Sequence, residues 1–389
     1  MNKVLLAGLA FALSSSVALA DTIKIGVVGP FSGPAALQGR NFQAGIDAWL
    51  ALNGNTIGDD TIEIVYRDLP AADPAQSAAL TQELIVSEGV HYLAGYYYTP
   101  DAMAAAPILE EGNVPMVVFN AATSAIVNAS PYVVRTSFTT FQTSTPMAEV
   151  ARERDLNKII TVVSDYGPGV DSETAFVRAF TAAGGEIVES VRMPMNTNDF
   201  SPMMQRIKDS GAEAVFAFLP AGPATLGFMQ AYVENGLKDA GVTLLAPGDL
   251  TQEPDLAALG DNALGLLTTF HYAVSHDSPE NEEFVVAATK AIGGNAADLS
   301  FPAVGAYDGM YVISKMIEAT GGEQDAAAAV EVVKGLSWTS PRGPVSINPE
   351  NRHLTQNIYL REVAFEDGLY INKEIQTFEN QGDPGWVAP

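Results

Sequence analysis

The sequence predicts an α/β protein with two lobes, each built around a doubly wound parallel sheet. Apolar strands alternate with amphipathic helices from Thr22 to Phe119, as in sheets whose parallel strands are joined by crossover helices. The same rhythm restarts at Lys158–Val163, which is similar in character to Lys24–Val28 and also leads into a loop of glycine and proline. The chain of 389 residues is 47% hydrophobic, which is enough to fill two folded cores.

The first 20 residues are predicted to form a secretory signal peptide. Lys3 gives a basic start, Val4–Leu13 is a short apolar run, and Ala18-Leu19-Ala20 forms an A-x-A cleavage site. The apolar run is too short to span a bilayer. Cleavage after Ala20 would give a mature chain that begins at Asp21 and lies in the periplasm. The chain contains no cysteine, so its stability must come from core size rather than from disulfides.

The charge of the chain argues against two classes of partner. It carries 46 Asp and Glu residues against 20 Lys and Arg residues, which gives a formal charge of −26. Because phosphate binding requires basic side chains, no nucleic-acid partner is expected. The same acidity argues against docking on an anionic lipid surface.

Each element of the first lobe is predicted from an apolar pattern and the breakers around it. The expected strands are 22–28, 61–66, 91–95 and 115–119. The expected helices are 41–52, ended by Asn53-Gly54, 73–89, begun by Asp73-Pro74, and 100–111, capped by Thr99 and ended by Gly112-Asn113.

The second lobe repeats this rhythm after Tyr132–Arg135. Its expected strands are 158–163, 186–191, 214–218, 242–246 and 264–270, and its expected helices are 202–209 and 222–235. Two further helices, 280–292 and 303–318, follow without strands of their own, so we expect them to cover the first lobe. The chain should end in a β-ribbon of residues 356–363 and 370–377. No low-complexity linker separates the lobes, which predicts several short crossings.

Two loops of the first lobe form the candidate site. Strands 91–95 and 115–119 belong to one β-α-β unit, so their carboxyl ends meet at one edge of the sheet, where ligands bind in open α/β folds. The first of these loops contains Tyr96–Tyr98, which offer flat and partly polar walls. The alternative is that these tyrosines only pack.

A carboxylate is the ligand group that these loops favour. Thr99 is placed to cap the helix that follows, with Pro100 at its first position, and the helix start offers N–H groups to an anion. Thr123 and Ser124 add hydroxyls from the neighbouring loop. The alternative for Thr99 is that it only caps its helix.

Enzyme chemistry has little support in the sequence. The four histidines, His91, His271, His276 and His353, form no H-E-x-x-H arrangement, and a cysteine nucleophile or ligand is absent. No G-x-S-x-G elbow, Walker A loop or G-x-G-x-x-G fingerprint is present. Neither a metal nor a cofactor is expected. Carboxylates are plentiful, so a secreted acidic hydrolase remains the alternative of a different class.

Five motifs of the chain carry a resemblance to a known family. Residues 23–34, 120–124, 165–169, 301–309 and 343–349 resemble, in this order, the motifs of branched-chain amino-acid-type solute-binding proteins of ABC importers. Each motif alone is weak, but their order is specific and they extend over essentially the whole mature chain. The resemblance implies a type I periplasmic binding protein, in which two Rossmann-like lobes joined by three crossings close on a small ligand and then dock on a membrane permease.

The resemblance also implies a division of the chain and a set of ligand contacts. Residues 21–138 with 273–343 would form the N-terminal lobe, and residues 139–272 with 344–389 the C-terminal lobe. Thr99 and Thr123 match positions that hold a ligand carboxylate in the family. Tyr166 matches the position where the second lobe contributes an aromatic lid, and Phe301 matches the position of an apolar ligand contact. The expected contacts are completed by Tyr98 and Ala121 from the same loops and by Asp249 at a strand end of the second lobe.

The departures from the family pattern concern the choice of ligand. Leucine-type members have a tyrosine where this chain has Leu37-Gln38, and they place a glutamate against the ligand ammonium where this chain has the shorter Asp249. The family disulfide is missing. Relatives with similar loops include some that are expected to take aromatic carboxylates, and Tyr96–Tyr98 would suit a ring. We expect a small carboxylate, with a branched-chain or other apolar amino acid first and a benzoate-like acid second.

The expected role is that of a periplasmic, monomeric, non-enzymatic receptor that delivers its ligand to an ABC permease. A sensor that binds the same ligand for a signalling partner would have the same pocket, and the sequence does not separate the two roles.

Overall fold

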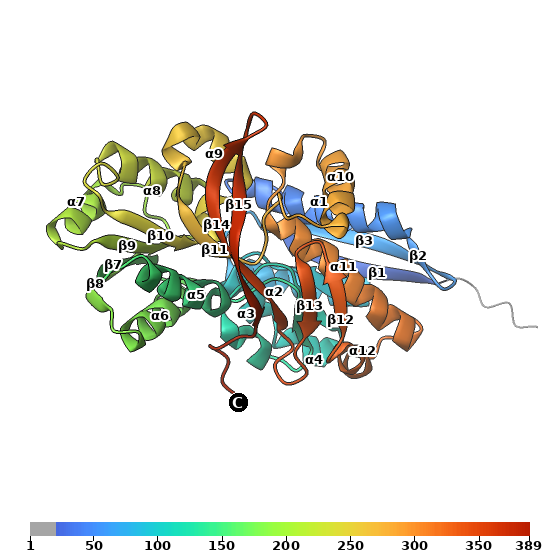
Figure 1. The fold of residues 1–389 in the computed structure, drawn as a ribbon. Coiled ribbons are helices and arrows are strands. Elements are labelled where there is room, and N and C mark those ends of the chain that lie inside the picture. Colours follow the sequence, from blue (N-terminus) through green and yellow to red (C-terminus); the bar gives the residue numbers. More distant parts are fainter. Residues whose placement is uncertain (1–20) are drawn as a thin grey trace, which may run out of the picture.

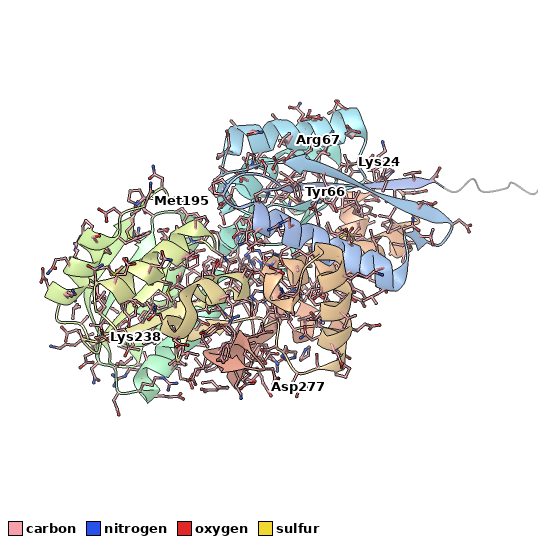
Figure 2. All side chains as sticks on the ribbon, turned by 90° about the horizontal axis from the view of Figure 1, so that it is seen from above. Lys24, Tyr66, Arg67, Met195, Lys238 and Asp277 are labelled. Atoms are coloured by element: carbon pink, nitrogen blue, oxygen red, sulfur yellow. The ribbon has the colours of Figure 1, made fainter. Side chains whose placement is uncertain are left out.

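The structure, a computed structural model, describes residues 21–389. The predicted signal peptide at residues 1–20 lies outside the described residues. Two lobes stand side by side, with the long strands β14 (Leu354–Glu366) and β15 (Leu369–Gln381) between them (Figure 1). In the view from above, Tyr66 and Arg67 lie on the first lobe, and Met195 and Lys238 lie on the second (Figure 2).

The first lobe contains a sheet of six strands. Their spatial order is β2 (Thr56–Ile57), β3 (Asp60–Asp68), β1 (Thr22–Gly29), β4 (Tyr92–Gly95), β5 (Met116–Val118) and β6 (Val133–Arg135). All neighbours pair in parallel except the short edge strand β2. The doubly wound sheet predicted for this half is therefore confirmed, and the carboxyl ends of β4 and β5 are adjacent.

The second sheet has nine strands. Their spatial order is β12 (Ser337–Ser340), β13 (Gly343–Ile347), β14, β11 (Leu267–Phe270), β10 (Thr243–Pro247), β9 (Ala214–Phe218), β7 (Lys158–Ser164) and β8 (Glu186–Met193), with β15 paired to β14. Strands β7 to β11 pair in parallel, whereas β12 to β15 add antiparallel ribbons. The predicted terminal β-ribbon is present and longer than expected.

Helices cover both sheets (Figure 1). In the first lobe they are α1 (Ala36–Asn53), α2 (Pro74–Glu83), η1 (Leu84–Glu88), α3 (Thr99–Ala105), α4 (Ile108–Gly112), η2 (Ser124–Asn128), α10 (Pro279–Ile292), η5 (Ala296–Asp298), α11 (Phe301–Thr320) and α12 (Ala326–Val333). In the second they are α5 (Thr140–Glu153), α6 (Gly167–Ala182), α7 (Ser201–Asp209), α8 (Pro223–Glu234), η3 (Gly248–Thr251), α9 (Glu253–Leu259) and η4 (Gly260–Ala263).

The two returning helices pack on the first lobe, as predicted. Both α10 and α11 contact α1, and residues of α11 share a buried core with β1, β4 and β5. The approach is close, because a Cβ built on Gly45 of α1 would stand 2.1 Å from the carbonyl oxygen of Ala303. Glycine is therefore required where these two helices cross.

Three predicted boundaries were wrong. Residues 99–111 form two short helices rather than one, because Pro107 supplies no N–H to continue the first. Helix α1 begins at Ala36 instead of 41, since Gly39 weakens the local helical signal but packs on Pro30, where a Cβ would stand 2.3 Å from its carbonyl oxygen. Strand β11 begins at Leu267 instead of 264, after the turn of η4.

The chain passes from the first lobe to the second between β6 and α5, returns between β11 and α10, and joins the second sheet again through β13 and β14. Strands β12 and β13 are paired into the second sheet, yet Val345 and Ile347 pack in the core of the first lobe. These strands therefore belong to the hinge itself.

A buried arginine joins two of the three crossings to helix α11. Arg342 donates to Asp308 of α11 over 2.6 Å, to the carbonyl oxygen of Thr136 over 2.8 Å and to Gln356 of β14 over 3.2 Å. Both members of the ion pair are essentially inaccessible, with side-chain exposures of 0% for Arg342 and 1% for Asp308. One guanidinium group thus ties the first and third crossings to α11 of the first lobe.

Candidate functional site

The candidate site is a cavity between the two lobes. Its free volume is about 20 Å³, room for about one water molecule, so the residues that line it are packed closely together. The first lobe contributes Tyr97, Tyr98, Thr99, Asn120, Ala122 and Phe138, and the second contributes Tyr166, Pro168, Phe218, Pro220, Ala221 and Asp249. Five of these twelve side chains are aromatic, so the cavity is suited to a flat apolar ligand body.

The first-lobe wall comes from the two loops that the sequence predicted to be adjacent. Thr99 Oγ1 accepts a hydrogen bond from the backbone N–H of Thr123 over 3.4 Å, which ties the loop after β4 to the loop after β5. The Oγ1 atom of Thr123 is buried and has no hydrogen-bond partner among residues 21–389. A buried hydroxyl without a partner is costly, so this atom is a candidate for contact with a ligand oxygen.

The prediction that Thr99 caps its helix was wrong by one position. Helix α3 begins at Thr99 itself, and Tyr98 occupies the cap position with an extended backbone and no side-chain hydrogen bond to the helix. Pro100 remains in the first turn, where its missing N–H is harmless. The Thr99 hydroxyl is therefore available to the neighbouring loop instead of to its own helix.

A strained residue sets the direction of the tyrosine run. Tyr96 has a φ of 60°, in the left-handed region that non-glycine residues rarely occupy, and its buried hydroxyl lies 2.7 Å from Thr81 Oγ1. The two tyrosines that follow it line the cavity. Tyr97 reaches across the cleft and donates to the carbonyl oxygen of Ala221 over 3.0 Å.

The second lobe faces these loops with an aromatic pair and a glycine. Tyr166 stacks on Phe218 with ring centroids 6.2 Å apart, and both rings line the cavity. Burial, followed by the nearby Asp249, holds the pKa of Tyr166 well above its ordinary value, so this side chain remains a neutral phenol. Gly167 then begins α6 directly against the first-lobe threonines.

Asp249 is the acidic group of the cavity. It lies in η3 after β10, it is only 5% exposed, and its Oδ2 has no hydrogen-bond partner in the part of the chain that the structure describes. Burial raises its pKa to about 7, although the charge of Arg361 acts in the opposite direction. Near neutral pH this carboxyl group can therefore gain or lose a proton when a ligand arrives.

Two further hydrogen bonds span the cleft. Gln38 of α1 donates to the side-chain oxygen of Gln252 over 2.8 Å, and the backbone N–H of Ser124 donates to Asp171 of α6 over 3.1 Å. These contacts require the lobes to be close together. The structure therefore represents a closed arrangement of the two lobes.

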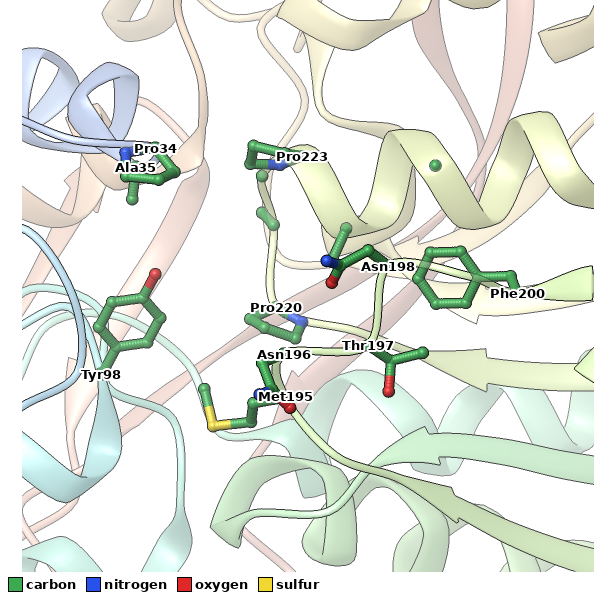
Figure 3. Close-up of a pocket in the computed structure, with 14 residues that line it drawn as sticks. Pro34, Ala35, Tyr98, Met195, Asn196, Thr197, Asn198, Phe200, Pro220 and Pro223 are labelled. Carbon is green, nitrogen blue, oxygen red and sulfur yellow. The ribbon is translucent and has the colours of Figure 1, made fainter.

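A wider hollow adjoins the cavity and opens toward solvent. Pro34, Ala35 and Tyr98 lie on one side of it and second-lobe residues, including Met195 and Pro223, lie on the other (Figure 3). It shares Tyr98, Pro220 and Ala221 with the inner cavity, so it forms the mouth of the cleft.

The expected ligand residues divide into two groups. Four of them, Tyr98, Thr99, Tyr166 and Asp249, line the cavity. Thr123 is not among the lining residues, but its backbone N–H donates to Thr99, which is one of them. Ala121 packs in the first-lobe core, and Phe301 contacts the cavity-lining Phe138 with ring centroids 5.8 Å apart, so these two lie one layer behind the wall.

Sequence reasoning missed several cavity-lining residues, of which Asn120, Phe138, Phe218 and Ala221 are examples. Phe218 and Ala221 lie at and just after the end of β9, so the strand-end rule would have found them if it had been applied to the second lobe. Phe138 lies in a crossing between the lobes, and no local pattern indicates which way such a side chain points.

Two further observations bound the chemistry of residues 21–389. Within this range, no group of three or more His, Asp or Glu side chains is arranged to hold a metal ion. None of the helices in the same range combines the length and the apolar character that crossing a membrane would need.

Comparison with known proteins agrees with this architecture. Residues 22–368 match the family described as periplasmic binding protein. Leu/Ile/Val-binding protein homolog 6 of Brucella melitensis is 72% identical over 390 aligned residues, which cover 100% of both chains.

Solved structures are similar over nearly the whole chain. A solute-binding protein of an ABC transporter from R. palustris, in complex with 4-hydroxybenzoate, has a TM-score of 0.93 and 59% identity, and covers 94% of this chain and 100% of its own. Another, from Rhodopseudomonas palustris in complex with 3,4-dihydroxy benzoic acid, has a TM-score of 0.89 and 40% identity, and covers 94% of this chain and 99% of its own. The present chain belongs to the periplasmic binding protein family and is a leucine-binding-protein-like solute-binding protein of an ABC transporter.

Proposed function

We propose that this receptor captures an aromatic carboxylate that carries a ring hydroxyl, of the 4-hydroxybenzoate class. The observation that carries the proposal is the cavity itself, where aromatic side chains from both lobes surround the unpartnered Asp249. The R. palustris protein in complex with 4-hydroxybenzoate, at 59% identity, supports the same ligand class.

In this proposal the two lobes bind opposite ends of the ligand. The ligand carboxylate accepts hydrogen bonds from the free hydroxyl of Thr123 and from backbone N–H groups of the first-lobe loops. The ring lies between Tyr98 and the stacked pair Tyr166 and Phe218. The ring hydroxyl meets Asp249, whose protonated form can donate to it. This order places the anionic end of the ligand away from Asp249, the one acid among the described residues that line the cavity.

A branched-chain amino acid is the second candidate. It is favoured by the name of the Brucella melitensis relative, at 72% identity, and by Asp249, which could pair with an α-ammonium group. The two candidates make opposite demands on the same carboxyl group. An ammonium requires Asp249 to be ionised, whereas an uncharged ring keeps it buried and protonated.

Proton linkage therefore tests the proposal. Calorimetric titration near pH 7, in two buffers with different ionisation enthalpies, measures the protons exchanged on binding. We expect 4-hydroxybenzoate to bind with proton uptake and with an affinity that falls as pH rises through about 7. Leucine, isoleucine or valine should produce little heat. Binding of leucine with proton release, together with no binding of 4-hydroxybenzoate, would establish the amino-acid assignment instead.

The wider role follows from the same proposal. We propose that the mature chain begins at Asp21, acts in the periplasm as a monomer without catalysing a reaction, and delivers its ligand to an inner-membrane permease of the ABC type. The division into residues 21–138 with 273–343 and 139–272 with 344–389 describes the two bodies that we expect to move. A sensory role would require a signalling partner in place of the permease, and pull-down of the permease by the liganded protein separates the two.

A further inference from the structure

The chain continues past β15 as the segment Gly382–Val387, which we call the C-terminal strap. Strand β15 belongs to the second sheet, but the strap leaves it and contacts η2 of the first lobe. The end of the chain lies beside the junction of the two lobes, near α3 and α5 (Figure 1). The strap therefore links the lobes once more, in addition to the three crossings.

Asp383 anchors the strap. Its Oδ1 accepts hydrogen bonds from Ser124 Oγ over 2.9 Å, from Thr139 Oγ1 over 3.1 Å and from the backbone N–H of Gly385 over 3.0 Å. Its Oδ2 lies 3.1 Å from His353 Nε2, and the Asp383 side chain is 0% exposed. One carboxylate thus joins η2, the cap of α5 and the start of β14.

The charges around Asp383 favour its ionised form. Burial alone would raise its pKa, but the contact with His353, the hydrogen bond from Gly385 and the charge of Arg135 hold the pKa below its ordinary value. Burial lowers the pKa of His353 to about 4, so this imidazole is neutral at pH 7. Besides Asp383 and Arg135, the charged group that faces this cluster is Asp171 of α6.

The tip of the strap is fixed on the first lobe. The indole N–H of Trp386 donates to the side-chain oxygen of Asn128 over 3.0 Å, and the Asn128 amide donates to the carbonyl oxygen of Val387 over 2.9 Å. The Trp386 ring packs against the core that contains Ile126. The strap is therefore docked by apolar packing as well as by hydrogen bonds.

The start of the strap contacts the loop that carries Thr123. Ser124 directly follows Thr123. Its hydroxyl donates to Asp383, and its backbone N–H donates to Asp171. Arg135 holds the same loop from below, by donating to the carbonyl oxygen of Thr123 over 2.6 Å. None of the strap residues lines the cavity. The Thr123 hydroxyl is thus oriented by groups that do not touch the ligand space.

We propose that Asp383 is a positioning residue for ligand binding, through which the C-terminal strap holds the Thr123–Ser124 loop in its binding geometry. This positioning role depends on the proposed function in one respect, namely that Thr123 contacts the ligand. Loss of the Asp383 charge leaves the Ser124 and Thr139 hydroxyls with a weaker acceptor, so the loop gains freedom that binding must then remove.

The test combines Asp383→Asn with Thr123→Val in a double-mutant cycle, with affinities for 4-hydroxybenzoate measured by calorimetry. We expect Asp383→Asn alone to weaken binding at least about tenfold, equivalent to about 1.4 kcal/mol. In the Thr123→Val background the same change should cost less than about twofold, because the group that it positions is already gone. Glu379→Gln, an exposed charge change four residues away on β15, is the matched control and should leave affinity unchanged.

A purely structural role for Asp383 predicts a different pattern. The two losses would then multiply in the double variant, or the affinity of Asp383→Asn would equal that of the wild type, and either result overturns the proposal. If Asp383→Asn fails to fold, Trp386→Phe takes its place, because it keeps an aromatic side chain at the strap tip and removes the indole N–H that binds Asn128.

Hydrogen exchange supplies a readout that needs no ligand. The amide N–H of Ile126, which donates to the carbonyl oxygen of Thr123 over 3.4 Å within the first lobe, should lose protection in Asp383→Asn and keep it in Glu379→Gln, both measured without ligand. Unchanged protection at Ile126 overturns the positioning role whatever the ligand is. If protection is lost in Asp383→Asn but the wild-type protein does not bind 4-hydroxybenzoate, only the ligand assignment is refuted and the positioning role stands.

Discussion

Gly167 of the second lobe lies against Thr123 of the first so closely that a Cβ built on Gly167 would stand 2.6 Å from Thr123 Oγ1. Its φ is not in the left-handed region, so the glycine is required by the space between the lobes rather than by backbone conformation. The contact exists only while the lobes are together. The lack of a side chain at position 167 is therefore a condition for closure.

Gly167→Ala should weaken ligand binding without destabilising the free protein. The added methyl group opposes closure by about 1–3 kcal/mol, as in other overpacked contacts, which corresponds to an affinity about 5- to 150-fold lower. Calorimetry gives the affinity, and small-angle scattering with saturating ligand should show a larger radius of gyration than for the wild type. Arg178→Ala, an exposed change on the same helix α6, is the control and should leave affinity unchanged. An unchanged affinity for Gly167→Ala would mean that binding does not require this degree of closure.

Thr123→Val and Thr99→Val should each weaken binding while the fold persists. Each change removes a hydroxyl and conserves the shape of the side chain, so for Thr123 the loss reports a hydrogen bond to a charged ligand oxygen, about 1.5–3 kcal/mol. Thr99→Val also removes the acceptor of the Thr123 N–H, so its loss includes the weaker tie between the two loops. The affinity is expected to fall by about 10- to 150-fold. Thr123→Ser, which restores the hydroxyl, should recover most of it. Equal affinity for the wild type and both valine variants would remove the two threonines from the site.

Asp249→Asn should change how the stability of the free protein depends on pH. The pKa of Asp249 is about 7 in the folded protein, against an ordinary value of 3.8. Between about pH 4 and 7 the unfolded chain has released this proton while the folded protein retains it, so the free energy of unfolding falls as pH rises through this window. The Asn variant has no proton to release at this position, so its free energy of unfolding does not fall for this reason. Relative to the wild type, its stability should increase by up to about 1.4 kcal/mol for each unit by which pH rises in this window.

Urea unfolding of both proteins at several pH values measures this difference. The comparison is between variants, because Asp101, whose pKa is also raised to about 7 by burial, contributes the same trend to both. A difference that stays constant from pH 4 to 8 would show that Asp249 is ionised in the free protein throughout.

Asp308→Asn should destabilise the whole molecule. The change leaves the guanidinium of Arg342 buried without its counter-charge, which typically costs about 3–5 kcal/mol. Glu318→Gln, which breaks the exposed pair with Lys315 on the same helix, is the matched control and should cost less than about 1 kcal/mol. Thermal unfolding compares the two. A similar small effect for both would show that the hydrogen bonds of Arg342 to backbone carbonyls suffice at the hinge.

The architecture could be predicted from the sequence because strand and helix periodicity is local. The apolar patterns of residues 22–28 and 158–163 each predict a buried strand. The parallel connection of β4 and β5 brings the loops that follow them to one edge of the sheet. Because the carboxyl ends of parallel strands meet at one edge, Thr99 and Thr123 were predicted to lie side by side, and in the structure a hydrogen bond joins them. The predicted helix cap at Thr99 was wrong because a competing partner, the N–H of Thr123, lies in another loop.

The sequence by itself therefore determined two lobes, the edges at which their loops meet, and the acidic, cysteine-free character of the chain. Only the tertiary structure decided which residues face each other across the cleft. Gln38 and Gln252 are 214 positions apart, and Ser124 and Asp383 are 259 apart, so no local pattern relates either pair. The raised pKa of Asp249 has the same origin, since it comes from burial between elements that are distant in the chain. Such contacts depend on how two folded lobes close, and that geometry exists only after both have formed.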